Sequence, residues 1–140
     1  MDIFSLNDKE INNDLKRLAN DDLKRTTFSL HNTIIGDQVY IEDGAKVQGS
    51  FLNSEDGPIY IANGAEIMEG SMVRGPFVMH EGSVLKLGTK VYGASTLGPY
   101  CKVGGEVNNV VFQGYANKAH DGFWGNSVIG EWCNLGADTN

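Results

Sequence analysis

The sequence predicts an all-β fold, a β-helix wound from six-residue repeats, and three observations support this prediction. Aliphatic residues recur at every sixth position, a residue that is usually small follows four positions later, and glycine turns lie in between. The aliphatic positions are Ile35, Ile41, Val47, Ile61, Ile67, Val73, Met79, Leu85, Val91, Leu97 and Val103. The last eight of these are followed by Ala65, Ser71, Phe77, Ser83, Thr89, Ser95, Cys101 and Val107.

The six-residue period has a simple physical reading. Each hexad makes one short strand and one corner, and three hexads close a triangular coil. The aliphatic residue fills the interior, the small residue fits a corner where a large one would clash, and glycine supplies the positive φ of the turn. A β-sandwich is the alternative, but its strands alternate with a period of two. We therefore expect stacked coils over 35–107, with these side chains inside: Ile61, Ile67, Val73, Leu85, Val91 and Val103.

The hexad phase is interrupted twice. Between Val47 and Ile61 there are two extra residues, which we assign to the polar loop 53–58. Between Val103 and Ile129 the spacing reads as four hexads plus two residues, with the slip somewhere in 104–128. A departure from a regular repeat is where a solenoid can aim side chains at a ligand, so the second interruption is the candidate site.

The segment 1–33 differs from the repeats and is expected to be a helix and linker. Asn7 and Glu10 have the spacing of a capping box, and Ile11, Leu15 and Leu18 follow at helical intervals. This pattern predicts a short amphipathic helix over about 8–19, ahead of a β-helix over 34–140.

Composition limits the classes of function. The net charge of −7 argues against a nucleic-acid or membrane-surface role, which needs a basic patch. No apolar run is long enough for a membrane span, and the start does not resemble a signal peptide. Cys101 and Cys133 are too few for a disulfide framework and are expected to be buried residues of a cytoplasmic protein.

His120 is the histidine that falls within the second interruption, in the stretch 117–126. His31 lies in a polar approach to the first coil, and His80 follows the interior Met79, so both are expected at the surface. From position alone, His120 is either a functional residue or a histidine packed in a loop beside Phe123 and Trp124.

Several stretches resemble a known enzyme family. They read LGPY at 97–100, GEVNN at 105–109, KAH at 118–120, GNSVIGE at 125–131 and NLGADTN at 134–140. They resemble the bifunctional UDP-N-acetylglucosamine pyrophosphorylase/glucosamine-1-phosphate N-acetyltransferases, closest to a variant bacterial branch, from about residue 35 onward. The spacing from His120 to Gly130 matches that family. The resemblance implies a left-handed wind, a homotrimer, and a leading helix that joins a nucleotidyltransferase domain to the β-helix.

The resemblance also implies roles for individual residues. The reaction would transfer an acetyl group from acetyl-CoA to an amino-sugar phosphate such as glucosamine-1-phosphate, in sugar-nucleotide biosynthesis. His120 would be the general base, and imidazole suits this role because it is mostly neutral near pH 7. Asn134 matches an asparagine that contacts the sugar, and Glu106 matches an acidic residue across from it. Mg²⁺ would be needed only by the nucleotidyltransferase domain, which this chain does not contain.

The sequence departs from the family where the sugar phosphate is held. Gly104, Asn108 and Phe123 stand where better-known members have arginine, lysine and tyrosine, and these substitutes lack the anion-holding group. Lys102 and Lys118 are candidates to compensate. The substituted sites put the phosphorylated substrate in question more than the acetyl transfer.

Two further readings remain. The chain could be a non-catalytic β-helix that oligomerises and regulates a nucleotidyltransferase. A γ-class carbonic anhydrase shares the fold, but its zinc needs closely spaced histidines, and here His80 and His120 are forty residues apart. No capping segment follows the last hexad, so we expect a longer natural chain whose later coils supply much of the acetyl-CoA site. Residues 1–140 alone are therefore expected to be nearly inactive.

Overall fold

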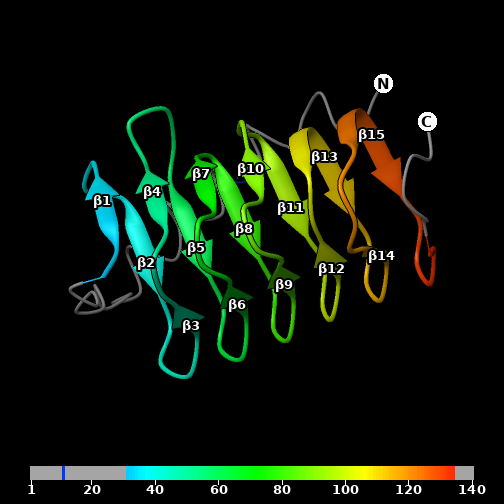
Figure 1. The fold of residues 1–140 in the computed structure, drawn as a ribbon, viewed down its shortest axis with the longest axis horizontal. Coiled ribbons are helices and arrows are strands. Elements are labelled where there is room, and N and C mark those ends of the chain that lie inside the picture. Colours follow the sequence, from blue (N-terminus) through cyan, green and yellow to red (C-terminus); the bar gives the residue numbers. More distant parts are fainter. Residues whose placement is uncertain (1–10, 12–30, 135–140) are drawn as a thin grey trace.

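The computed structural model describes residue 11 and residues 31–134, and residues 31–134 form a left-handed parallel β-helix (Figure 1). All pairings between its named strands are parallel. A five-stranded sheet takes one strand from each coil, so the described chain makes about five coils. The all-β prediction is confirmed.

Each coil has three faces. The first face contains β1 (Thr33–Ile35), β4 (Phe51–Asn53), β7 (Met72–Arg74), β10 (Lys90–Val91) and the first halves of β13 (Glu106–Phe112) and β15 (Phe123–Ile129). The second contains β2 (Val39–Ile41), β5 (Ile59–Ile61), β8 (Phe77–Met79), β11 (Ser95–Leu97) and the second halves of β13 and β15. The third contains β3 (Lys46–Val47), β6 (Glu66–Ile67), β9 (Val84–Leu85), β12 (Lys102–Val103) and β14 (Asn117–Lys118).

The core is a set of columns that run along the axis, because strands of successive coils pair in register. On the third face the inward residues are Val47, Ile67, Leu85, Val103 and Lys118. All six residues predicted to lie inside are at most 2% exposed. Fully burying one such aliphatic side chain contributes about 1.5–3 kcal/mol. Each coil that places an aliphatic residue in these columns therefore contributes to stability.

The predicted small residues lie buried at the corners. Ser83 and Thr89 are both 0% exposed. The Ser83 hydroxyl donates to the carbonyl of His80 at 2.6 Å, and the Thr89 hydroxyl donates to the carbonyl of Lys86 at 2.6 Å. Each buried hydroxyl thus has a partner on its own turn, as buried polar groups require.

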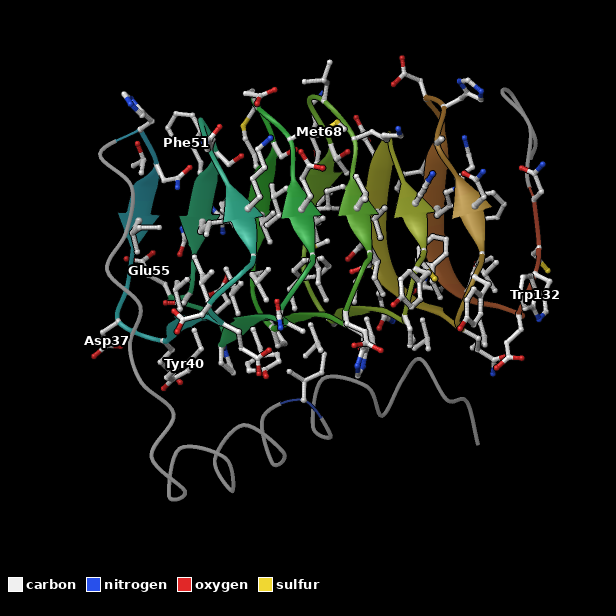
Figure 2. The ribbon with its side chains drawn as sticks, turned by 90° about the horizontal axis from the view of Figure 1, so that it is seen from below. Asp37, Tyr40, Phe51, Glu55, Met68 and Trp132 are labelled. Atoms are coloured by element: carbon white, nitrogen blue, oxygen red, sulfur yellow. The ribbon has the colours of Figure 1, made fainter. Side chains whose placement is uncertain are left out.

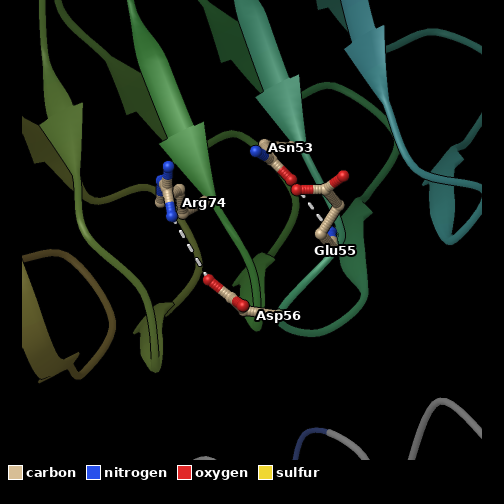
Figure 3. A network of polar contacts seen from close by, with 4 residues as sticks. All are labelled: Asn53, Glu55, Asp56 and Arg74. Atoms are coloured by element: carbon tan, nitrogen blue, oxygen red, sulfur yellow. Dashed lines mark hydrogen bonds and ion pairs between the residues drawn. The ribbon is translucent and has the colours of Figure 1, made fainter.

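The loop predicted between Val47 and Ile61 is present at 54–58, after β4. Figure 3 shows how it is attached to the coils. The Asp56 carboxylate lies 3.4 Å from Arg74 Nη1 on β7, and the backbone N–H of Glu55 donates to the Asn53 side chain at 2.9 Å. Glu55 and Asp56 form the exposed tip of this insertion, and the strands on either side of it still pair in register with the neighbouring coils.

The second interruption differs from the prediction of four hexads plus two residues. The structure has five steps there, and three of them are short of a full hexad. The interior positions are Val103, Val107, Phe112, Lys118, Trp124 and Ile129. The strands β13 and β15 continue around one corner, with Asn109 (φ 55°) and Asn126 (φ 49°) in the left-handed region. At the corner within each of these two strands, a single asparagine replaces a longer turn. Fewer residues therefore separate the interior positions on either side of the corner.

Other expectations need correction or fall outside the described residues. Ile35 was expected inside but is 40% exposed, because Ile34 pairs with the interior Leu52. Cys133 is only half-buried, since no coil of the described chain covers it, whereas Cys101 is buried as expected. Of the predicted helix over 8–19, only Ile11 is described, and it is helical and 4% exposed.

Candidate functional site

The loop 119–122 joins β14 on the third face to β15 on the first face (Figure 1). It carries His120 and Asp121, and both are exposed. The loop is bonded to the preceding coil at both ends. The backbone N–H of Gly104 donates to the carbonyl of Lys118 at 2.6 Å, and that of Glu106 donates to the carbonyl of Gly122 at 2.8 Å. The corner therefore presents an imidazole and a carboxylate on a short, tied segment.

A pocket of about 420 Å³ lies against this loop. The side chains that line it come from three coils, Lys90 on β10, Glu106 on β13, and Asp121 and Phe123 beside or on β15. Gly88, Gly105 and Gly122 line it as well. With two carboxylates and one lysine, the pocket favours a cationic or hydroxyl-rich ligand over a free anion.

The lysine of this pocket is already paired. Lys90 Nζ lies 3.7 Å from Glu106 Oε1, and the two side chains are 48% and 43% exposed. A pair this exposed contributes about 0–1 kcal/mol. Its energy is small, and so a ligand group could separate the two side chains at little cost.

Three of the predicted site residues share the first face. Glu106 pairs with Phe123 and Asn108 pairs with Gly125, so all three predicted side chains project from neighbouring strands. A Cβ added at Gly125 would lie 2.9 Å from the ring of Phe123, which shows that the ring leans over this glycine. Phe123 is 62% exposed. Glu106, Asn108 and Phe123 therefore form one continuous surface beside the loop of His120.

Asn134 and Lys102 lie on the other side of the corner. Asn117 pairs with Lys102 on one side and forms a parallel bridge with Asn134 on the other, so all three belong to the third face. Both Lys102 and Asn134 are exposed. Within 31–134 the buried Oδ1 of Asn117 has no hydrogen-bond partner. The predicted residues thus divide between two faces, with His120 at the corner that joins them.

Gly104 has a structural reason for being glycine. A Cβ at this position would lie 2.7 Å from the carbonyl oxygen of Ala119. A side chain therefore does not fit unless the loop that carries His120 moves. The departure from the family at this position is tied to the path of the loop.

Lys118, predicted to hold substrate, points inward. It is 0% exposed, and its Nζ donates to the carbonyl oxygens of His120 at 2.5 Å and Asp121 at 3.0 Å. It pairs with Val103 in the column that aliphatic residues fill in the earlier coils. Sequence reasoning missed this position because it divided the interval from Val103 to Ile129 into four hexads plus two residues, whereas two shorter steps precede Lys118.

Sequence reasoning also missed a stack of aromatic rings at one corner. Tyr100 and Tyr115 stack at 5.5 Å, and Tyr115 and Trp132 stack at 4.4 Å. Trp132, 72% exposed, lies at the end of the β-helix opposite Asp37 (Figure 2). All three residues have positive φ, at a corner where the preceding coil has Gly82. The available signal was their spacing in the sequence, which is close to the length of one coil.

The other histidines lie outside this site. His31 and His80 are both exposed, as predicted. The imidazole of His80 is still partly shielded from water, and this partial burial lowers its pKa, an effect that the negative charge of Glu81 partly offsets. In the described part of the chain, no three His, Cys, Asp or Glu side chains gather as metal ligands. Nor does that part contain a helix of the length and apolarity needed to cross a membrane.

Comparison of the chain with protein-family models and with curated proteins gives no match.

Proposed function

We propose that this β-helix is the acetyl-transfer part of an acetyl-CoA-dependent N-acetyltransferase that acts on an amino sugar carrying a phosphate. The observation that supports the proposal most is the exposed His120 on a tied corner loop, beside a pocket lined by Glu106, Asp121 and Phe123. A general base must be held in place and remain reachable by the substrate, and this loop meets both needs.

The proposed chemistry is a direct transfer. The amine nitrogen of the sugar attacks the thioester carbon of acetyl-CoA, His120 takes a proton from that nitrogen, and the carbon–sulfur bond breaks to release CoA as its thiolate. Glu106 and Asp121 attract the protonated amine before it loses its first proton to water, and His120 takes the second proton as the nitrogen attacks. Phe123 offers an exposed ring against which a sugar face can pack. A positioned base of this kind contributes roughly 10²–10⁴-fold in rate.

The proposed substrate also needs a cation that binds its phosphate. Lys118 is buried with its amine on backbone carbonyls, and Lys90 is paired with Glu106. The exposed Lys102, on the third face beside Asn117, is the cation we assign to the phosphate. Lys102→Ala should then raise KM for glucosamine-1-phosphate several-fold and leave KM for unphosphorylated glucosamine unchanged.

The test is release of CoA thiol from acetyl-CoA by the protein at its natural length, with glucosamine-1-phosphate, glucosamine or a neutral sugar as acceptor. We expect thiol release with the amino sugars only, and most with the phosphorylated one. His80→Asn is the matched control for His120→Asn, because both histidines are exposed and His80 lies at a different corner, between β8 and β9. No thiol release with any amino sugar would refute the proposed function.

A second function, self-association, is favoured by one observation. An apolar groove of about 260 Å³ crosses the first face near the start of the β-helix. Its large exposed side chains are Ile35, Phe51, Met72 and Tyr92, each between 40% and 54% exposed. Exposed apolar surface of this sort marks an interaction site. We propose that the β-helix associates with copies of itself as a homotrimer.

Sedimentation tests the assembly separately from the chemistry. Phe51→Glu should convert the trimer to smaller species, because it places a charge in the groove without touching the interior columns. Leu87→Glu, which adds the same single charge at an exposed apolar position outside the groove, is the control. A wild-type protein that sediments as a stable monomer would remove the trimer proposal and leave the transfer chemistry untouched.

A further inference from the structure

Lys118 occupies a position where an aliphatic residue would serve the fold. The same column holds Val47, Ile67, Leu85 and Val103 in the earlier coils. Of the Lys, Arg, Asp and Glu side chains in the described residues, Lys118 alone is buried, at 0% exposure. Removing an ammonium group from water is unfavourable unless it is well hydrogen-bonded. A lysine here therefore calls for a reason other than filling space.

The reason lies where its amine ends. The side chain runs through the interior to the corner, and Nζ donates to the carbonyl oxygens of His120 and Asp121 at 2.5 and 3.0 Å. The place where a Cβ of Gly122 would stand is 3.1 Å from the same nitrogen. One amine thus bonds two consecutive residues of the loop 119–122, and the glycine at the next position leaves room for it.

Apart from the bonds donated by Lys118, the loop 119–122 is held by the described residues only at its two ends. The backbone bonds to the neighbouring coil involve the carbonyls of Lys118 and Gly122. Among the described residues, the hydrogen bonds that reach the middle of the loop come from the Lys118 amine. Without them, two carbonyl groups would face the interior unpaired, and the peptide planes would be free to turn.

We infer that Lys118 is a positioning residue: it holds two successive carbonyls of the loop inward and thereby fixes the outward direction of the His120 and Asp121 side chains. This inference rests on the proposed function for its catalytic meaning, but the anchoring of the loop does not depend on it. The lysine acts through the backbone, from inside the β-helix, and does not touch the substrate.

The test compares two substitutions in one column. Lys118→Met keeps an unbranched side chain of similar length and removes the donors. Leu85→Met, two coils earlier, places the same residue in the same interior column away from the loop. Lys118→Met leaves two carbonyl groups without a donor, so its melting temperature should be somewhat lower, whereas Leu85→Met should change the melting temperature little. Both variants are compared with the wild type at a temperature where all three are folded.

Two measurements follow on the protein at its natural length. Amide hydrogen exchange of Glu106, whose N–H donates to the carbonyl of Gly122 in the loop, should be faster by roughly tenfold in Lys118→Met, because a loop without its lysine anchor opens more often, and unchanged in Leu85→Met. In acetyl transfer, kcat should fall by about tenfold or more in Lys118→Met with KM little changed, because the loss is one of base orientation. Leu85→Met should keep the kcat of the wild type.

The outcomes separate the inference from the proposed function. Unchanged exchange of the Glu106 amide in Lys118→Met overturns the anchoring itself. Faster exchange with unchanged kcat in an active protein overturns the positioning role. If the wild type transfers no acetyl group, the proposed function fails on its own, and the exchange measurement still decides whether Lys118 holds the loop.

Discussion

The coils up to Val103 and the coils after it are built by different rules. In the earlier region from Val73 to Val103, successive interior positions are one hexad apart. In the later region shorter steps occur, and Lys118 and Trp124 stand in the interior columns. The regular region provides stability, and the irregular region uses the same frame to present side chains at one corner.

The corners show the same contrast. At one corner the residue with positive φ is Gly64 and then Gly82, but in the next coils it is Tyr100, Tyr115 and Trp132. A bulky residue in the left-handed region costs about 1–2 kcal/mol, and each aromatic pair offsets about 0.5–1.5 kcal/mol of this. Stacking between coils therefore offsets the unfavourable backbone conformation of these aromatic residues.

The largest expected effect concerns the irregular region and its chemistry. His120→Ala should lower kcat by roughly 10²–10⁴-fold and leave the free energy of unfolding nearly unchanged, because the exposed side chain supports no packing. Steady-state kinetics and urea unfolding measure the two quantities. Unchanged kcat together with a lowered melting temperature would show that His120 is a packing residue.

The next effect concerns the regular region and its stability. Leu85→Ala should lower the free energy of unfolding by about 2–5 kcal/mol, because Leu85 is 0% exposed between Ile67 and Val103. Phe123→Ala, on the exposed surface of the later region, should change it by less than about 0.5 kcal/mol. Equal losses in the two variants would contradict the division into a stabilising region and a presenting region.

Two glycines sharpen the comparison of the corners. A Cβ at Gly82 (φ 69°) would overlap the ring of Tyr100, whereas a Cβ at Gly88 (φ 65°) meets nothing within 4 Å. Gly88→Ala should cost about 1 kcal/mol from the left-handed conformation alone. Gly82→Ala should cost more, since the Tyr100 ring must also move out of the stack. Thermal unfolding of both variants measures the difference, and identical values would mean that the ring moves freely.

The smallest expected effect is a loss of stability at alkaline pH, and it arises in the early coils. Burial, together with the hydrogen bond from its hydroxyl to Glu42, raises the pKa of Tyr60 above its usual range. The folded state then holds the phenolic proton more tightly than the unfolded chain. The contribution of Tyr60 to the free energy of unfolding should accordingly be constant up to about pH 10 and fall as the pH rises further.

Tyr60→Phe should remove part of this fall when urea unfolding is compared at about pH 8 and about pH 11. The Cys101 thiol, whose pKa is also raised by burial, adds a further fall that begins at about pH 9. A wild-type stability that rises above about pH 10 would contradict the sign of both shifts.

The aliphatic period and the corner glycines were sufficient to predict the β-helix, the six interior residues from Ile61 to Val103, and a loop at 53–58, which the structure has at 54–58. They were sufficient because each hexad satisfies its packing locally and every coil repeats the last. The same reasoning located His120 at an interruption of the repeat. The roles of His120 and Asn134 remain predictions, as does the binding of substrate by Glu106, Asn108 and Phe123.

What the tertiary structure alone decided is the register after Val103. The interval from Val103 to Ile129 fits several combinations of long and short steps, and only the pairing of β13 with β15 selects one. That choice turns Lys118 inward, leaves no space for a side chain at Gly104, and brings three aromatic rings into a stack. Each of these depends on contacts that the later coils make across corners and between turns, and a local repeat carries no information about them.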